Sequence, residues 1–93
     1  MEEIVPTEFQ LSQNYPNPFK EKTTIKYCVP DKVRIGLEVF DSSRIKVKTL
    51  VKEIKEAGTY KVEIDARNLP EGIYFYRFNA GDFIETKKMV LLR

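Results

Sequence analysis

The sequence predicts an all-β protein, an antiparallel sandwich of about seven strands. Short runs in which apolar and polar residues alternate recur along the chain, as expected of strands that bury one face. The runs are rich in β-branched and aromatic residues, and Gly, Pro, Asn or Asp separates one run from the next. Because 93 residues suffice for one two-layer core, we expect a single domain over residues 1–93, with residues 1–8 as a leader or linker.

Residues 9–22 are predicted to form a proline-rich segment that packs on the sandwich. Its centre, residues 14–19, has the sequence NYPNPF. Each proline fixes φ, lacks a backbone donor and favours an extended residue before it, so this run fits neither a helix nor the middle of a sheet. Tyr15 and Phe19 are large aromatic residues, which a flexible polar linker rarely carries. We therefore expect Tyr15 and Phe19 to anchor an extended chain on the folded domain.

Two strongly alternating strands follow the proline-rich segment. In residues 23–29 the apolar positions are Ile25, Tyr27 and Val29, and Pro30 ends the run. In residues 33–39 every odd-numbered position is apolar. Both strands should bury this apolar face in the sandwich.

Residues 44–55 are compatible with two structures. Val47, Leu50, Val51 and Ile54 fall at the spacing of a helix face. The same segment also alternates as a strand does, because the odd-numbered residues from 45 to 51 are β-branched and lysines stand at most positions between them. We expect a strand, since one helix would interrupt a sandwich that every other segment supports.

The rest of the chain is predicted to form strands over residues 58–64, 73–80 and 83–92, with turns at 65–68 and 79–82. Aromatic and β-branched residues again occupy alternate positions. Across all the strands, the expected core positions include Tyr27, Val39, Tyr60, Val62, Ile64, Tyr74 and Tyr76.

Composition argues against several classes of function. The 16 basic and 14 acidic residues give a formal net charge of +2, which is not the strongly basic field of a nucleic-acid-binding protein. The longest apolar run, residues 89–92, is far too short for a transmembrane segment. Met1-Glu2-Glu3 is acidic where a signal peptide would be basic, so we expect no signal peptide in this chain.

Neither catalytic residues, nor a metal site, nor a cofactor is predicted. The sequence has no histidine, the commonest general base and metal ligand. Cys28 is the only cysteine, so an internal disulfide and a Cys–His pair are both impossible. The carboxylates occur among lysines in predicted turns and exposed strand faces. We therefore expect a protein that is not an enzyme.

Motifs spread over most of the chain are LSQNYPNPF at 11–19, TTIKY at 23–27, LEVFD at 37–41, AGTY at 57–60, LPEGIYFYR at 69–77 and TKKMVLLR at 86–93. In this order and spacing they resemble the type A C-terminal sorting domain of proteins exported by the type IX secretion system, over about residues 9–93. That domain is a small immunoglobulin-like β-sandwich, similar also to the Ig-like domain of flagellar hook-capping proteins. The residues of its structural motif are, by this resemblance, Asn14, Pro16, Asn17, Pro18, Phe19, Gly58 and Tyr60.

The chain departs from this family at the turn after Asp41. Related domains usually carry a glycine and then an arginine there, whereas this chain has Arg44 and Ile45. A glycine would suit a left-handed turn, so its absence weakens the expectation of a hairpin at this point.

The resemblance implies a non-catalytic sorting signal at the C-terminus of a larger cargo protein. Such a precursor passes through the periplasm and crosses the outer membrane, and it is then secreted or held at the cell surface. The implied partners are the type IX translocon, a surface sortase-like protease and the fused cargo domain, with no nucleic acid. The alternative is a structural or ligand-binding Ig-like module, which could belong to a hook-capping assembly or stack Tyr74 and Tyr76 against a carbohydrate.

Recognition residues are expected in the last two strands. Gly72 and Tyr74 match the Gly-x-Tyr element that the family associates with recognition by the export machinery. Lys87, Lys88 and Arg93 flank the apolar run 89–92 and would form a basic C-terminal address of exposed charges that contribute little to stability. Structural interpretations compete with both, because residues 69–74 also resemble the turn into a tyrosine corner and charges beside an apolar strand also suppress aggregation.

Overall fold

The computed structural model describes residues 6–93, and every regular element in this part of the chain is a β-strand. Most of the predicted leader, residues 1–5, lies outside the described residues. The all-β fold with seven strands is confirmed. The strands are β1 (Gln10–Leu11), β2 (Lys22–Val29), β3 (Val33–Phe40), β4 (Lys46–Lys55), β5 (Gly58–Asp65), β6 (Gly72–Ala80) and β7 (Phe83–Leu91).

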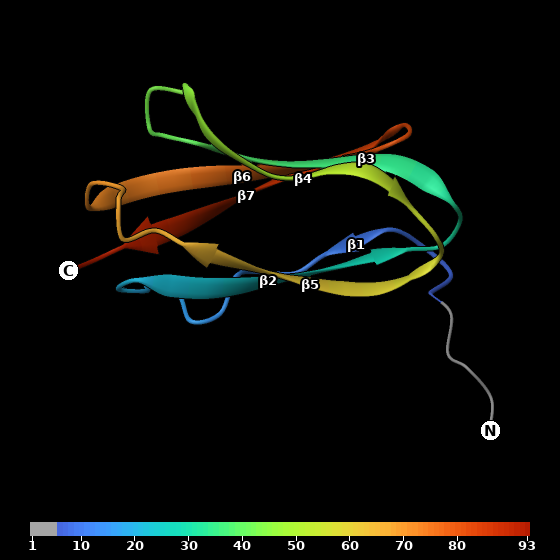
Figure 1. Cartoon of the computed structure of the whole chain (residues 1–93), viewed down its shortest axis with the longest axis horizontal. Helices are drawn as coiled ribbons and strands as arrows, with labels where there is room; N and C mark the ends of the chain where they lie inside the picture. Colours follow the sequence, from blue (N-terminus) through green and yellow to red (C-terminus); the bar gives the residue numbers. More distant parts are fainter. Residues whose placement is uncertain (1–5) are drawn as a thin grey trace.

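The strands form two antiparallel layers that pack face to face (Figure 1). One sheet has the order β1-β2-β5 and the other has the order β4-β3-β6-β7. β3–β4 and β6–β7 are hairpins within the larger sheet, whereas the connections β2–β3, β4–β5 and β5–β6 cross between the layers. The arrangement is an immunoglobulin-like sandwich in which the fourth strand lies beside the third instead of joining the first sheet.

The core forms where the alternating residues of the two sheets meet. In β2, β3 and β6 the apolar phase predicted from the sequence is the buried one. Tyr76, Phe78 and Leu37 have no exposed surface. Tyr60 and Val62 point toward the core but are only partly buried, because β5 is an edge strand that pairs with β2 alone.

Residues 46–55 form strand β4, as expected, and β-bulges explain why the same segment also has helical spacing. Register shifts interrupt the β3–β4 ladder between Leu37 and Glu38 and between Val39 and Phe40. An extra residue in one strand breaks strict alternation. Leu50 and Val51 are consecutive, and both pack against the core.

The β3–β4 hairpin forms although its turn lacks the glycine that would suit a left-handed conformation. Arg44 itself takes the left-handed conformation, with φ at 68°. Asp41 holds the turn, because its Oδ1 accepts hydrogen bonds from the backbone N–H groups of Ser43 at 2.8 Å and Ile45 at 3.0 Å. These bonds offset the steric cost of a positive φ at a residue with a Cβ.

Half of the expectation for the two aromatic anchors is wrong. Phe19 is buried, with 2% of its surface exposed, but Tyr15 is 81% exposed. Tyr15 exchanges two backbone hydrogen bonds with Thr24, each of 2.9 Å. Because neighbouring residues of an extended chain face opposite sides, the burial of Asn14 turns Tyr15 to solvent.

The proline-rich segment also bends where continuous extension was expected. Residues 16–18 are bends, and the Tyr15–Pro16 and Asn17–Pro18 peptide bonds are cis. Before the bend the chain pairs with β2 of the smaller sheet. After it, Phe19 donates to the carbonyl of Val90 and accepts from the N–H of Leu92, at 3.0 and 2.9 Å. The segment therefore joins an edge of one sheet to an edge of the other.

A buried polar network holds this crossing in place. Tyr76 Oη donates to the carbonyl of Ser12 at 2.7 Å and accepts from the backbone N–H of Asn14 at 2.9 Å. Asn14 Nδ2 in turn donates to Thr23 Oγ1 at 3.0 Å and to the carbonyl of Pro16 at 3.1 Å. Burial raises the pKa of Tyr76 to about 12, so its hydroxyl stays protonated and able to donate at neutral pH.

We expect Tyr76→Phe to lower the free energy of unfolding by about 1–3 kcal/mol, since it leaves the buried N–H of Asn14 without its acceptor. Tyr27→Phe is the matched control, because Tyr27 is also a core residue, with 2% of its surface exposed, and its hydroxyl is neither buried nor hydrogen-bonded to another of residues 6–93. Urea unfolding of both variants measures the difference. Equal losses would mean that the network adds nothing beyond ring packing.

Candidate functional site

The predicted recognition residues lie on two neighbouring strands at one end of the sandwich. In the β6–β7 ladder Gly72 is opposite Leu91 and Tyr74 is opposite Met89. The chain end at Arg93 follows directly after this pairing. The ladder therefore brings the Gly-x-Tyr element and the basic strand together, although the side chains of these residues lie on different faces and make different contacts.

Tyr74 forms the tyrosine corner. Its hydroxyl donates to the carbonyl of Pro70 at 2.5 Å, and only 4% of the residue is exposed. Burial also raises the pKa of Tyr74. Tyr76 is fully buried as well, so neither ring is available at the surface for stacking against a carbohydrate.

Gly72 begins β6 with φ at 153°, a value that residues with a side chain rarely adopt. A Cβ placed there would meet no atom within 4 Å. Its backbone conformation, and not lack of space, is therefore the reason for glycine at this position.

Arg93 is bonded to the β5–β6 connection. Its guanidinium donates to the carbonyls of Leu69 at 2.6 Å and Ala66 at 2.5 Å. Its backbone N–H donates to Glu71 Oε1 at 2.6 Å. Arg93 is exposed, as expected, but it is not a free charge, because it supplies hydrogen-bond donors for loop carbonyls at the end of the sandwich.

Lys87 and Lys88 lie on opposite faces of β7. Lys87 is on the core-facing phase of this edge strand, and its Nζ is 3.1 Å from Glu85 Oε2. An inward-pointing charge on an edge strand is a known protection against aggregation. Lys88 is exposed on the outer face opposite Phe75, and its ammonium pairs with no side chain of residues 6–93. Of the predicted basic residues, Lys88 is the one that presents an uncommitted charge.

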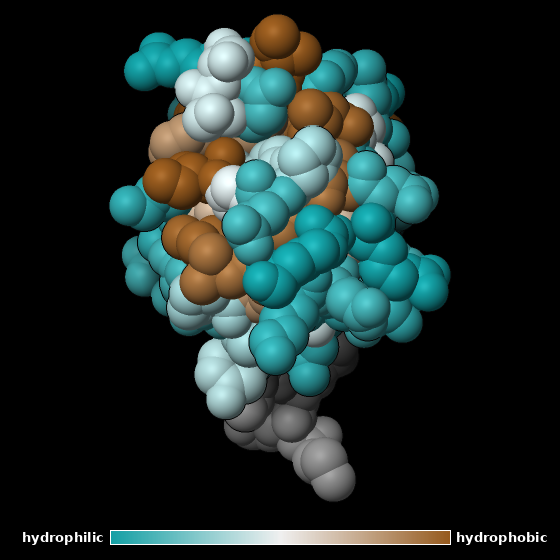
Figure 2. Space-filling model, turned by 90° about the vertical axis from the view of Figure 1, so that its left-hand side faces the viewer, coloured by the Kyte–Doolittle hydropathy of each residue, from teal (hydrophilic) through white to brown (hydrophobic). Residues whose placement is uncertain are grey.

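Beside Lys88, the outer face of the larger sheet has a feature that the sequence analysis missed. A hollow of about 360 Å³ is lined by Phe40, Arg44, Phe75, Arg77 and Thr86. Figure 2 shows this end of the molecule, where hydrophobic side chains appear between hydrophilic ones. The sequence does contain a sign of this hollow. Phe40 and Phe75 are aromatic residues at the outward-facing positions of strands whose inward-facing positions are apolar.

Arg77 and Glu38 organise the floor of this region. The Arg77 guanidinium lies 4.7 Å from the centre of the Phe40 ring and 3.4 Å from Glu38 Oε1. Lys46 Nζ is 3.1 Å from Glu38 Oε2, and its hydrogen bond holds the pKa of Glu38 below its ordinary value. Glu38 is thus ionised and fixed between the two cations.

Residues 6–93 contain no group of three or more Cys, Asp and Glu side chains placed to hold a metal ion. Cys28 Sγ lies on a strand face 3.6 Å from Thr59 Oγ1. Asp65 is paired with Arg67, whose hydrogen bonds lower the pKa of Asp65 to about 2. Within the same residues, no helix is long and apolar enough to cross a membrane.

Comparison with known proteins gives one family. A family model described as the secretion system C-terminal sorting domain matches residues 13–92. The match begins at Gln13, beside the buried Asn14, and ends one residue before Arg93. No curated protein and no solved structure gives a significant match.

We expect Arg93→Gln to lower the free energy of unfolding by about 1 kcal/mol, because a shorter neutral side chain cannot reach both loop carbonyls. Lys88→Gln should change it by less than about 0.5 kcal/mol, as for other exposed charges. Thermal and urea unfolding compare the variants. If the losses are equal and small, the bonds from Arg93 to Ala66 and Leu69 do not hold the loop in solution.

Proposed function

Because the chain belongs to the family of type IX secretion C-terminal sorting domains, we propose that it is the non-catalytic address of a larger cargo protein. The observation that carries the proposal is the family match, which covers the proline-rich segment from Gln13 onward and every strand from β2 to β7. The sandwich contributes the scaffold, and recognition takes place on its surface.

In this proposal the domain takes its cargo from the periplasm across the outer membrane. The type IX translocon reads the folded domain, and a surface sortase-like protease then separates it from the cargo. The end of the sandwich built by β6 and β7 is the address. The uncommitted charge of Lys88 supports this assignment, whereas Lys87 and Arg93 already have partners in the fold.

A reporter protein fused upstream of Phe9–Arg93 should reach the surface of a cell with a type IX system, and the same reporter without the module should remain in the periplasm. Protease accessibility of the reporter on intact cells measures surface exposure. Retention of the fused reporter in the periplasm would contradict the proposal.

The alternative is a structural or ligand-binding Ig-like module, and moving the domain within the fusion distinguishes the two functions. A sorting address should lose its effect when it is moved to the interior of the fusion, with folding confirmed by circular dichroism. A module that binds a ligand or a neighbouring subunit should work equally well in both positions.

A further inference from the structure

Charge is distributed unequally between the two outer faces of the sandwich. On the outward positions of the larger sheet the acidic residue is Glu38, whereas the cations are Arg34, Lys46, Lys52, Arg77 and Lys88. Arg44 of the β3–β4 turn adds another cation, while Asp41 of that turn is bonded to backbone N–H groups. We call these outward cations, with Arg44, the basic face.

The outer face of the smaller sheet is close to balanced. Its strands carry Lys22, Lys26 and Lys61 together with Glu63 and Asp65. The chain as a whole has a formal net charge of only +2. The positive charge of the basic face is therefore a local concentration and does not reflect a generally basic protein.

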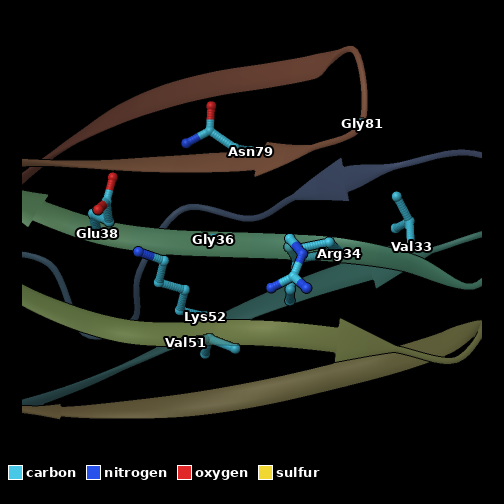
Figure 3. A pocket seen from close by; sticks show the side chains of 9 residues that line it. Val33, Arg34, Gly36, Glu38, Val51, Lys52, Asn79 and Gly81 are labelled. Atoms are coloured by element: carbon cyan, nitrogen blue, oxygen red, sulfur yellow. The ribbon is translucent and has the colours of Figure 1, made fainter.

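The basic face is also hollowed in two places. At Gly36 the missing side chain leaves a depression of about 430 Å³, bordered by Arg34, Lys52 and Asn79. Figure 3 shows Gly36 between the strands that carry Lys52 and Asn79. The second hollow is the one between Phe40 and Phe75, and the Glu38–Arg77 pair lies between the two.

The side chains of the basic face are suited to carboxylates. Arginine binds carboxylates through paired N–H donors, and both arginine and aromatic residues are enriched at the centres of protein interfaces. Arg77 Nε is buried, and it is the one buried side-chain nitrogen or oxygen of residues 6–93 without a hydrogen-bond partner. The hollow between Phe40 and Phe75 offers an apolar surface beside these donors. A partner with only charged side chains would leave that apolar surface exposed to water.

We propose that the basic face docks an acidic segment of an export-machinery protein, with an apolar side chain of that segment in the Phe40–Phe75 hollow. The inference rests on the proposed function and adds the surface that is read and the chemistry of the reader. Complementary charge across such a contact speeds encounter and selects the partner. Lys88 belongs to this face, so the basic address extends across the sheet instead of running along β7.

The test uses the surface-exposure assay on the full fusion, with paired charge variants. Arg44→Asn with Lys88→Gln removes two cations from the basic face, and asparagine tolerates the positive φ at position 44. Arg44→Lys with Lys88→Arg keeps the charge. Lys26→Gln with Lys61→Gln is the matched control, because these exposed lysines face each other on the outer side of the smaller sheet. Phe75→Thr tests the hollow with a residue that suits a strand.

The proposal predicts that surface exposure of the reporter falls by at least about tenfold in the neutralised pair and in Phe75→Thr. It falls less in the charge-keeping pair, and it is unchanged in the control. Thermal unfolding confirms that each variant is folded. If Phe75→Thr is unfolded, the two pairs of charge variants and the control test the proposal without it. Normal export of the neutralised pair overturns the proposal. So does an equal loss in the control, which would show dependence on total charge.

Two further results are distinguishable from these. If the unmodified fusion is not exported, the proposed function fails and this inference fails with it. If the neutralised pair is exported normally but no longer binds vesicles of anionic phospholipid that the unmodified domain binds, the basic face reads a membrane surface and the protein partner is excluded.

Discussion

The hydroxyl of Tyr76 connects the middle of the larger sheet to the chain that crosses between the sheets. It bonds to Ser12 and Asn14, whose neighbours pair with β2 of the smaller sheet. A polar group with no exposed surface is costly unless it is bonded, so these hydrogen bonds hold the proline-rich segment in its position. Phe19 is then placed in the core, and the β7 edge is covered from Lys88 to Leu92.

This connection makes the proline-rich segment and strand β7 one structural unit. Asn17 Oδ1 accepts from the N–H of Val90, and Phe19 bonds both Val90 and Leu92. Strand β7, which carries part of the proposed address, is therefore completed by residues of the proline-rich segment. The family model matches residues 13–92, a range that includes both β7 and the residues that hydrogen-bond to its outer edge. A sorting signal made of the last strand alone would lack those hydrogen-bond partners.

The sequence predicts which face of a strand is buried where apolar and polar residues alternate. It does not predict hydrogen bonds between side chains and residues far apart in the chain. The phase of Ile25, Tyr27 and Val29 was readable because period-two alternation is a local signal. The exposure of Tyr15 was not, since it depends on the burial of its neighbour Asn14 by Tyr76, a contact between residues 62 positions apart. Likewise the bonds from Arg93 to Ala66 and Leu69 depend on how a loop closes over the end of the sandwich.

Amide hydrogen exchange tests the central claim most directly, that the proline-rich segment is part of the cooperative fold. The amides of Asn14, Tyr15 and Phe19 donate to Tyr76, Thr24 and Val90. They should exchange only with global unfolding, at rates within about tenfold of the slowest amides of β3 and β6. Exchange of these amides as fast as that of the β3–β4 turn would contradict the account, because the segment would then open while the sandwich stays folded.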